Sequence, residues 1–182
     1  MAAPRDMPVL ILSGPPGVGK TTAAAGLAAR FARAAHLESD AFFRFVRSGY
    51  VEPWKPESQE QNQVVMGIVA GAAAGYAAAG YFTIVDGIVI PRWFLGPLRD
   101  ALHGAGHAVA YAVLRAPLAV CTERVQAREG EPPIEIDAIA GLWRDFTELG
   151  ELERNVIEAG GSSPEEVADL IAQRLSDGQL AV

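Results

Sequence analysis

The residues with the clearest chemical meaning form one run near the start of the chain, Gly14-Pro15-Pro16-Gly17-Val18-Gly19-Lys20-Thr21. This run matches the pattern G-x-x-x-x-G-K-[ST] in full, and it follows the apolar stretch Val9–Leu12 directly. Glycines permit a tight loop whose N–H groups turn inward, and a helix that starts there adds its own unpaired N–H groups. We therefore predict a polyphosphate cradle in which Lys20 contacts the β- and γ-phosphates, Thr21 coordinates Mg²⁺, and Thr22 adds a phosphate contact.

Two acidic residues stand at the ends of predicted strands. Asp40 follows the strand candidate His36–Ser39, and Asp86 closes the apolar run Tyr81–Val85. Open α/β sheets bind ligands at the carboxyl ends of their strands. We predict that Asp40 accepts the proton of an acceptor hydroxyl, the alternative being the N-cap of a helix that begins at Ala41. Asp86 is predicted to hold Mg²⁺ through water, the alternative being a turn residue.

Two arginines provide candidate cations for a transferring phosphoryl group. Arg124 and Arg128 stand four residues apart, so on a helix they share one face. Paired guanidinium groups suit phosphate oxygens. The alternative is a solvated helix face, with Glu123 and Glu129 as surface partners of the arginines.

Aromatic residues are concentrated directly after Asp40, where an acceptor would bind. They are Phe42, Phe43, Phe45, Tyr50 and Trp54. An aromatic wall beside a carboxylate suits a partly apolar hydroxylated molecule, and the predicted acceptor contacts are Asp40, Phe43, Tyr50, Trp54 and Arg92. Alternatively, Phe42, Phe45 and Val46 form one helix face packed on the core. The polar residues Glu60, Gln61 and Asn62 farther on would either contact the substrate or cap a helix.

The remaining pattern supplies the elements that must position these groups. Three strong strand candidates (Val9–Leu12, Tyr81–Val85, Ala108–Leu114) and two weaker ones (His36–Ser39, Asn155–Glu158) alternate with helical patterns. The helices are expected at Lys20–Ala34, Phe42–Arg47, Ser58–Ala79, Arg92–Leu102, Pro117–Arg128, Ile136–Leu149 and Pro164–Leu175. Such alternation predicts a parallel sheet covered on both faces.

The amino-acid composition restricts the classes of binding partner and the compartment. Fifteen Lys and Arg against 22 Asp and Glu give a net charge of −7, which disfavours broad binding to nucleic acid or to an anionic membrane. The uncharged stretch Val64–Val85 is better explained by a helix, a stop at Gly80 and a buried strand than by a membrane span. With one cysteine and no secretory pattern at the start, we expect a cytoplasmic protein.

The motifs together resemble those of small P-loop kinases. GPPGVGKT is similar to their Walker A, and no N-K-x-D guanine motif is present. Asp86-Gly87 followed by Pro91-Arg92 is similar to the D-G-x-P-R run of nucleoside monophosphate kinases, although three residues instead of one separate Gly87 from Pro91. The stretch from Cys121 to Gly130 resembles the E-R-x-x-x-R stretch of gluconate kinase and chloramphenicol phosphotransferase. The chain is short for an AAA+ module with its helical subdomain.

This resemblance implies a fold and an activity. The implied fold is a three-layer α/β P-loop domain over residues 1–182, with a five-stranded parallel sheet in the order 2-3-1-4-5, an acceptor-side insert at about 41–62 and a short lid at about 129–135. The implied activity is ATP- and Mg²⁺-dependent phosphorylation of a small-molecule hydroxyl, by a monomer or homodimer. Two alternatives stay open: a nucleotide or nucleotide-sugar kinase, including zeta-toxin-like enzymes, and an ATP-binding switch protein.

Overall fold

A five-stranded parallel sheet forms the centre of the protein in a computed structural model that describes residues 7–127 and 135–182. Its strands are β1 (Val9–Ser13), β2 (Ala34–Glu38), β3 (Phe82–Asp86), β4 (Val109–Arg115) and β5 (Val156–Glu158). They lie in the order β2-β3-β1-β4-β5, and every neighbouring pair is parallel. β1 and β3 are buried along their whole length, as expected of central strands with near-continuous apolar sequence. The predicted sheet and its strand order are confirmed.

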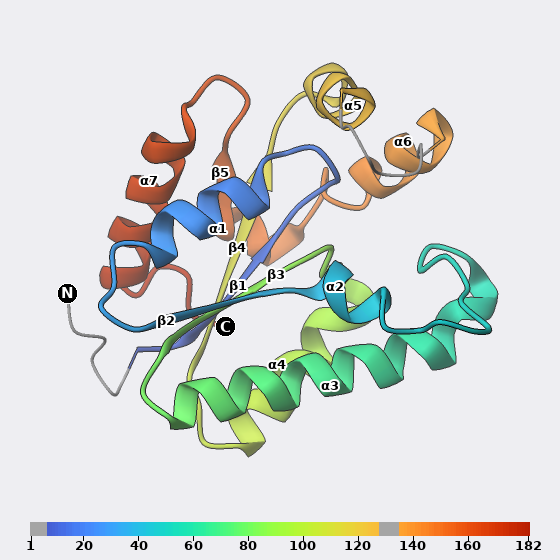
Figure 1. The fold of residues 1–182 in the computed structure, drawn as a ribbon. Coiled ribbons are helices and arrows are strands. Elements are labelled where there is room, and N and C mark those ends of the chain that lie inside the picture. The colour runs from blue at the N-terminus through green and yellow to red at the C-terminus, as the bar shows by residue number, and fades with distance from the viewer. Residues whose placement is uncertain (1–6, 128–134) are drawn as a thin grey trace.

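Helices cover both faces of this sheet. They are α1 (Lys20–Ala28), α2 (Ser39–Phe43), α3 (Gln59–Ala78), α4 (Gly96–Gly104), α5 (Leu118–Gln126), α6 (Ile136–Arg144) and α7 (Pro164–Ser176), with short 3₁₀ turns at Pro56–Ser58 and Gly150–Asn155 and a π turn at Pro91–Leu95. Figure 1 shows α1 and α7 on one face and α3 and α4 on the other. Each layer of helices packs against the sheet and forms a separate hydrophobic core with it. One core includes Leu27 and Ile171 on the first face, and the other includes Val69 and Leu98 on the second.

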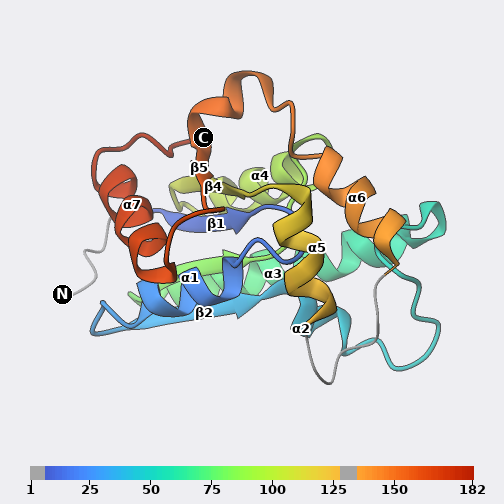
Figure 2. The ribbon, with the colours of Figure 1, turned by 90° about the horizontal axis from the view of Figure 1, so that it is seen from above.

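The remaining elements gather at the carboxyl ends of the strands. Figures 1 and 2 place α2, α5 and α6 at this end of the sheet, with α5 beside the loop that joins β1 to α1. Strand register brings Leu12 of β1 and Glu38 of β2 level with Asp86 of β3. Residues that follow these strands therefore share one edge, as predicted.

Several boundaries differ from the sequence expectation. The first helix was expected to run to Ala34, but it ends at Ala28 and Ala34 already pairs with Phe82 in the sheet. α2 begins at Ser39 with Glu38 as its N-cap, so Asp40 lies in the first turn and the N-cap alternative for Asp40 is wrong. The helix expected from Arg92 to Leu102 is divided into the π turn and α4.

Two details of the helix ends follow local chemistry. Gly80 ends α3 with a φ of +81°, and Ser163 and Glu166 form a reciprocal capping box at the start of α7. Arg128 and all of the expected lid except Glu135 lie outside the described residues. In the part of the chain that the structure describes, none of the helices has the length and apolar character needed to cross a membrane.

Candidate functional site

The loop between β1 and α1 has a conformation that only glycine allows. Gly14, Gly17 and Gly19 have φ values of +140°, +78° and +103°. A Cβ atom on Gly14 would lie 2.3 Å from the carbonyl oxygen of Leu114, and one on Gly17 would lie 2.2 Å from that of Cys121. The loop is thus pressed against β4 and α5 with no room for a methyl group.

Lys20 lies over this loop. Its Nζ donates hydrogen bonds to the carbonyl oxygens of Gly14 and Pro15, each at 3.0 Å. Thr21 and Thr22 follow it and are exposed at the start of α1, whose first turn carries no acidic side chain. The positive end of the helix dipole and an ammonium group therefore act on the same small volume, which suits an anion.

A second cation reaches the loop from α5. Arg124 donates from Nη1 to the carbonyl oxygen of Val18 at 3.3 Å. Burial raises the pKa of the Cys121 thiol below the loop, and the positive charges of Lys20 and Arg124 oppose that rise. Lys20 and Arg124 therefore both contact the loop, whereas the second predicted arginine, Arg128, lies outside the described residues.

Asp86 lies at the same edge, at the end of β3. It is only 3% exposed, and His36 of β2 lies beside it, with Nε2 3.3 Å from Oδ2. The next residue, Gly87, donates its N–H to Leu12 of β1, so the carboxylate is held next to the start of the loop. Sequence reasoning missed His36. The parallel pairing of β2 with β3, which sets His36 near the carboxylate, was the only available signal.

Asp40 is exposed in the first turn of α2. Partial burial raises the pKa of the Tyr50 hydroxyl, and the nearby charges of Glu52 and Asp40 raise it further. The charges of both carboxylates therefore act on the Tyr50 hydroxyl. Phe43 lies in the core instead of on an open wall. Of the alternative core-facing set, Phe42 and Val46 do pack against the core, whereas Phe45 is 73% exposed and does not.

The chain between α2 and α3 is fastened by polar side chains. Gln61 bonds both to the N–H of Val51 (2.9 Å) and to its carbonyl oxygen (2.7 Å). Ser58 donates to the carbonyl oxygens of Pro53 and Lys55, and Asn62 also donates to that of Pro53. Gln61 and Asn62 therefore hold the segment 51–55 against α3, and neither caps that helix.

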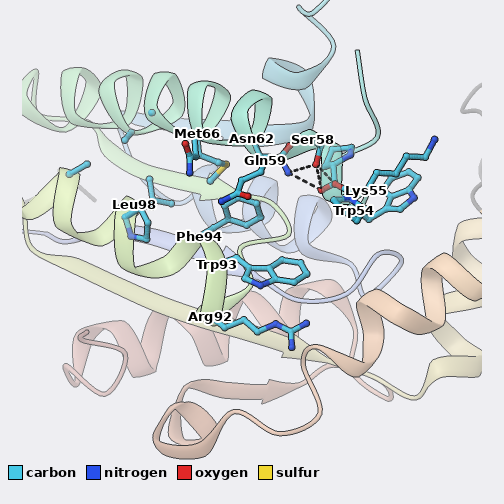
Figure 3. A pocket seen from close by; sticks show the side chains of 17 residues that line it. Trp54, Lys55, Ser58, Gln59, Asn62, Met66, Arg92, Trp93, Phe94 and Leu98 are labelled. Carbon is cyan, nitrogen blue, oxygen red and sulfur yellow. Dashed lines mark hydrogen bonds between the residues drawn. The ribbon is translucent and has the colours of Figure 1, made fainter. Parts of the chain in front are cut away.

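A groove of about 630 Å³ lies between α3, α4 and this segment, as Figure 3 shows. Two predicted acceptor contacts, Trp54 and Arg92, line it, whereas Asp40, Phe43 and Tyr50 do not. Arg92 lies over the ring of Trp93, 4.5 Å from its centroid, and forms an ion pair with Asp145 beyond α6. The predicted contacts are therefore divided between the edge of the sheet and this groove.

Comparison with known families decides the relationship. The family AAA_33, described as an AAA domain, matches residues 9–150, which include the loop, Asp40, Asp86 and Arg124. The chain belongs to this family. A search of curated proteins finds no match.

Solved structures agree with the P-loop kinase fold of this AAA_33 protein. The tunicamycin resistance protein of Deinococcus radiodurans superposes with a TM-score of 0.71 at 23% identity, over 93% of this chain and 95% of that one. A sugar kinase from a Janibacter species has a TM-score of 0.68 at 22% identity, covering 93% and 95% of the two chains. For shikimate kinase from Acinetobacter baumannii the TM-score is 0.66 at 21% identity, with 97% of both chains covered.

Proposed function

We propose that this protein is an ATP-dependent phosphotransferase that transfers the γ-phosphate to a hydroxyl group of a small, partly apolar molecule. One observation carries the proposal: a loop with three glycines at positive φ, to whose carbonyl oxygens Lys20 and Arg124 donate hydrogen bonds, lies at the sheet edge that also holds Asp40 and Asp86. A phosphate cradle alone would suit many ATP-binding proteins. Acidic groups beside it are what a kinase additionally requires.

The chain's own residues supply the steps of such a reaction. The loop amides and the start of α1 bind the phosphates, while Lys20 and Arg124 offset the negative charge that develops on the transferring group. The acceptor oxygen forms a bond to the γ-phosphorus as the bond from that phosphorus to the bridging β–γ oxygen breaks. Asp40 receives the acceptor's proton, and ADP carries the released electron pair.

Mg²⁺ fits the residues at this edge. Thr21 is exposed at the start of α1 and can offer its hydroxyl. Asp86 offers a buried carboxylate, and the His36 ring lies beside it. These are hard oxygen donors, which Mg²⁺ prefers, and one or two such ligands suffice where phosphates supply the others. When bound, the ion would neutralise phosphate charge.

The experiment is a screen of hydroxyl compounds for an ATP-dependent mass gain of one phosphate, followed by Asp40→Asn. We expect that variant to bind ATP as the unmodified protein does and to lose transfer by about 100-fold or more, since a positioned base contributes that much. Asp100→Asn, on the exposed surface of α4, is the matched control and should leave transfer unchanged. Equal loss in both variants would contradict the role of Asp40.

The two alternative functions have different outcomes in this assay. A nucleotide or nucleotide-sugar kinase would phosphorylate anionic acceptors and would need free cations, whereas Arg92 is already paired with Asp145. A switch protein would hydrolyse ATP without transfer to any hydroxyl, and Asp40→Asn would change its turnover little. Either pattern would replace the proposed acceptor class.

A further inference from the structure

The groove between α3 and α4 has the size and lining of a binding site. Its volume of about 630 Å³ lies within the range of small-molecule pockets, roughly 300–1,000 Å³. Met66 and Ala70 of α3 face Leu98 and Ala101 of α4 across it, and Phe94 contributes to its wall. Figure 3 shows Leu98 and Trp54 at opposite sides of this space, with Met66 and Phe94 between them. A long apolar group would find carbon atoms on both sides.

The chain that lines the groove is joined in sequence to the residues of the catalytic edge. Arg92 and Trp93 belong to the π turn that follows β3, the strand that ends at Asp86. Trp54 stands four residues after Tyr50, whose pKa responds to the charge of Asp40. Gln61 and Asn62 fasten the segment between them to α3. Polar side chains thus hold the segment that carries Trp54 against α3, and this segment connects the groove to the chain that follows α2.

The charges at the mouth are already paired. Lys55 forms a 2.8 Å ion pair with Glu52, and Arg92 pairs with Asp145. Asn62 also lines the groove, is 4% exposed, and has a carbonyl Oδ1 without a hydrogen-bond partner among the described residues. That oxygen is closed off from solvent, and the neighbouring cations are paired, so a neutral ligand with an apolar body suits this lining better than an anion does.

We infer that the α3–α4 groove binds an apolar arm of the acceptor, so that the substrate class is amphiphilic alcohols: a hydroxylated head at Asp40 and a hydrocarbon chain or flat ring system between the helices. This inference rests on the proposed function. It specifies the apolar part of the acceptor and assigns the contacts with that part to Met66, Ala70, Leu98 and Ala101.

The protein carries its own reporters for a test. Two of its three tryptophans, Trp54 and Trp93, line the groove, while Trp143 bonds through Nε1 to the carbonyl oxygen of Ala116 elsewhere. Bromoalkanols of increasing chain length quench tryptophan fluorescence on contact and serve as the probe. We expect saturable quenching that the double variant Trp54→Phe/Trp93→Phe abolishes. Each added methylene should lower the Kd by up to about fourfold, which corresponds to about 0.8 kcal/mol per buried methylene.

Two variants in which phenylalanine replaces an alanine distinguish binding in the groove from general binding to the surface. Ala101→Phe fills the groove from an exposed position on α4 and should raise the Kd of the longest probe by about tenfold or more, since a filled pocket forfeits several methylene contacts. Ala78→Phe adds the same ring to exposed α3 surface outside the groove and should change nothing. Quenching that does not saturate, or that both variants leave unchanged, overturns the inference. So does concentration-dependent dimerisation that Ala101→Phe abolishes, because a second copy would then be the occupant.

Binding of MgATP, measured on the same samples, keeps the two proposals distinguishable. If MgATP binds and the bromoalkanols do not, the groove inference fails and the phosphotransferase proposal stands. If the bromoalkanols bind and MgATP does not, the phosphotransferase proposal fails together with the assignment of the groove to an acceptor.

Discussion

One added methyl group at Gly17 should damage the phosphate loop. In Gly17→Ala the new Cβ would lie 2.2 Å from the carbonyl oxygen of Cys121 and 2.9 Å from Cγ2 of Val125, at a φ of +78°. The left-handed backbone costs about 1–2 kcal/mol for alanine, and the clash adds about 1–3 kcal/mol typical of overpacking. The expected total of about 2–5 kcal/mol is a large part of a usual folding stability.

This cost can appear in either of two measurements. If the loop stays in place, urea unfolding should show the loss in the free energy of unfolding. If the loop moves away from α5 to relieve the clash, the cradle is distorted and the affinity for MgATP should fall instead. Both quantities are therefore measured on the same sample, by urea titration and by calorimetry.

The chain offers a control with the opposite sign. Gly71 lies in the exposed middle of α3, where an added Cβ would have nothing within 4 Å. Gly71→Ala should therefore stabilise the protein by about 0.5–1 kcal/mol and leave nucleotide affinity unchanged. A Gly17→Ala protein with normal stability and normal MgATP affinity would refute the packing argument for the loop.

Three further predictions follow from particular contacts. Ser163→Ala removes the capping box with Glu166 and should lower the free energy of urea unfolding by about 1 kcal/mol; an unchanged midpoint would contradict this. The Tyr111 hydroxyl donates to the carbonyl oxygen of Val89, and burial raises the pKa of this hydroxyl in the folded protein. Above about pH 10, the tyrosine therefore ionises in the unfolded chain while it stays protonated in the folded one. The stability advantage over Tyr111→Phe should be about 1 kcal/mol at neutral pH, and it should shrink above about pH 10 in unfolding titrations; a constant difference would oppose this. His36→Leu removes the ring beside Asp86 and should raise the Mg²⁺ concentration for half-maximal ATP binding by about tenfold; unchanged Mg²⁺ dependence would argue against Asp86 as a ligand.

The sheet was predictable because its signals are local. Val9–Leu12 and Tyr81–Val85 are short apolar runs with turn residues after them, and residues that follow parallel strands must meet at one edge. The glycine pattern of the loop was equally informative, because positive φ values at Gly14, Gly17 and Gly19 demand glycine whatever surrounds them.

The misplaced boundaries have a tertiary origin. Residues 20–35 are rich in alanine and contain no proline, so local propensity favours a longer α1 than the observed nine residues. Pairing with β3 instead recruits Ala34 and Ala35 into the sheet, and Phe31 stacks on Phe82 with centroids 4.1 Å apart. Contacts between distant segments of the chain overrode the local preference.

The acceptor side was the least predictable part. The sequence predicts an aromatic wall after Asp40, but Phe43 packs inward, Phe45 faces solvent, and Trp54 lines a groove whose other wall is α4. No sequence motif indicates the contact between His36 and Asp86 or the two hydrogen bonds between Gln61 and Val51. Such contacts join residues through the fold, so a single sequence does not contain them as a pattern.

Calorimetric titration of the intact protein with MgATP tests the central claim most directly. The account predicts saturable binding with one site per chain and its near-complete loss in Lys20→Ala, because that ammonium bonds to the loop that holds the phosphates. Absence of heat with both MgATP and MgGTP, or unchanged affinity in Lys20→Ala, would contradict it.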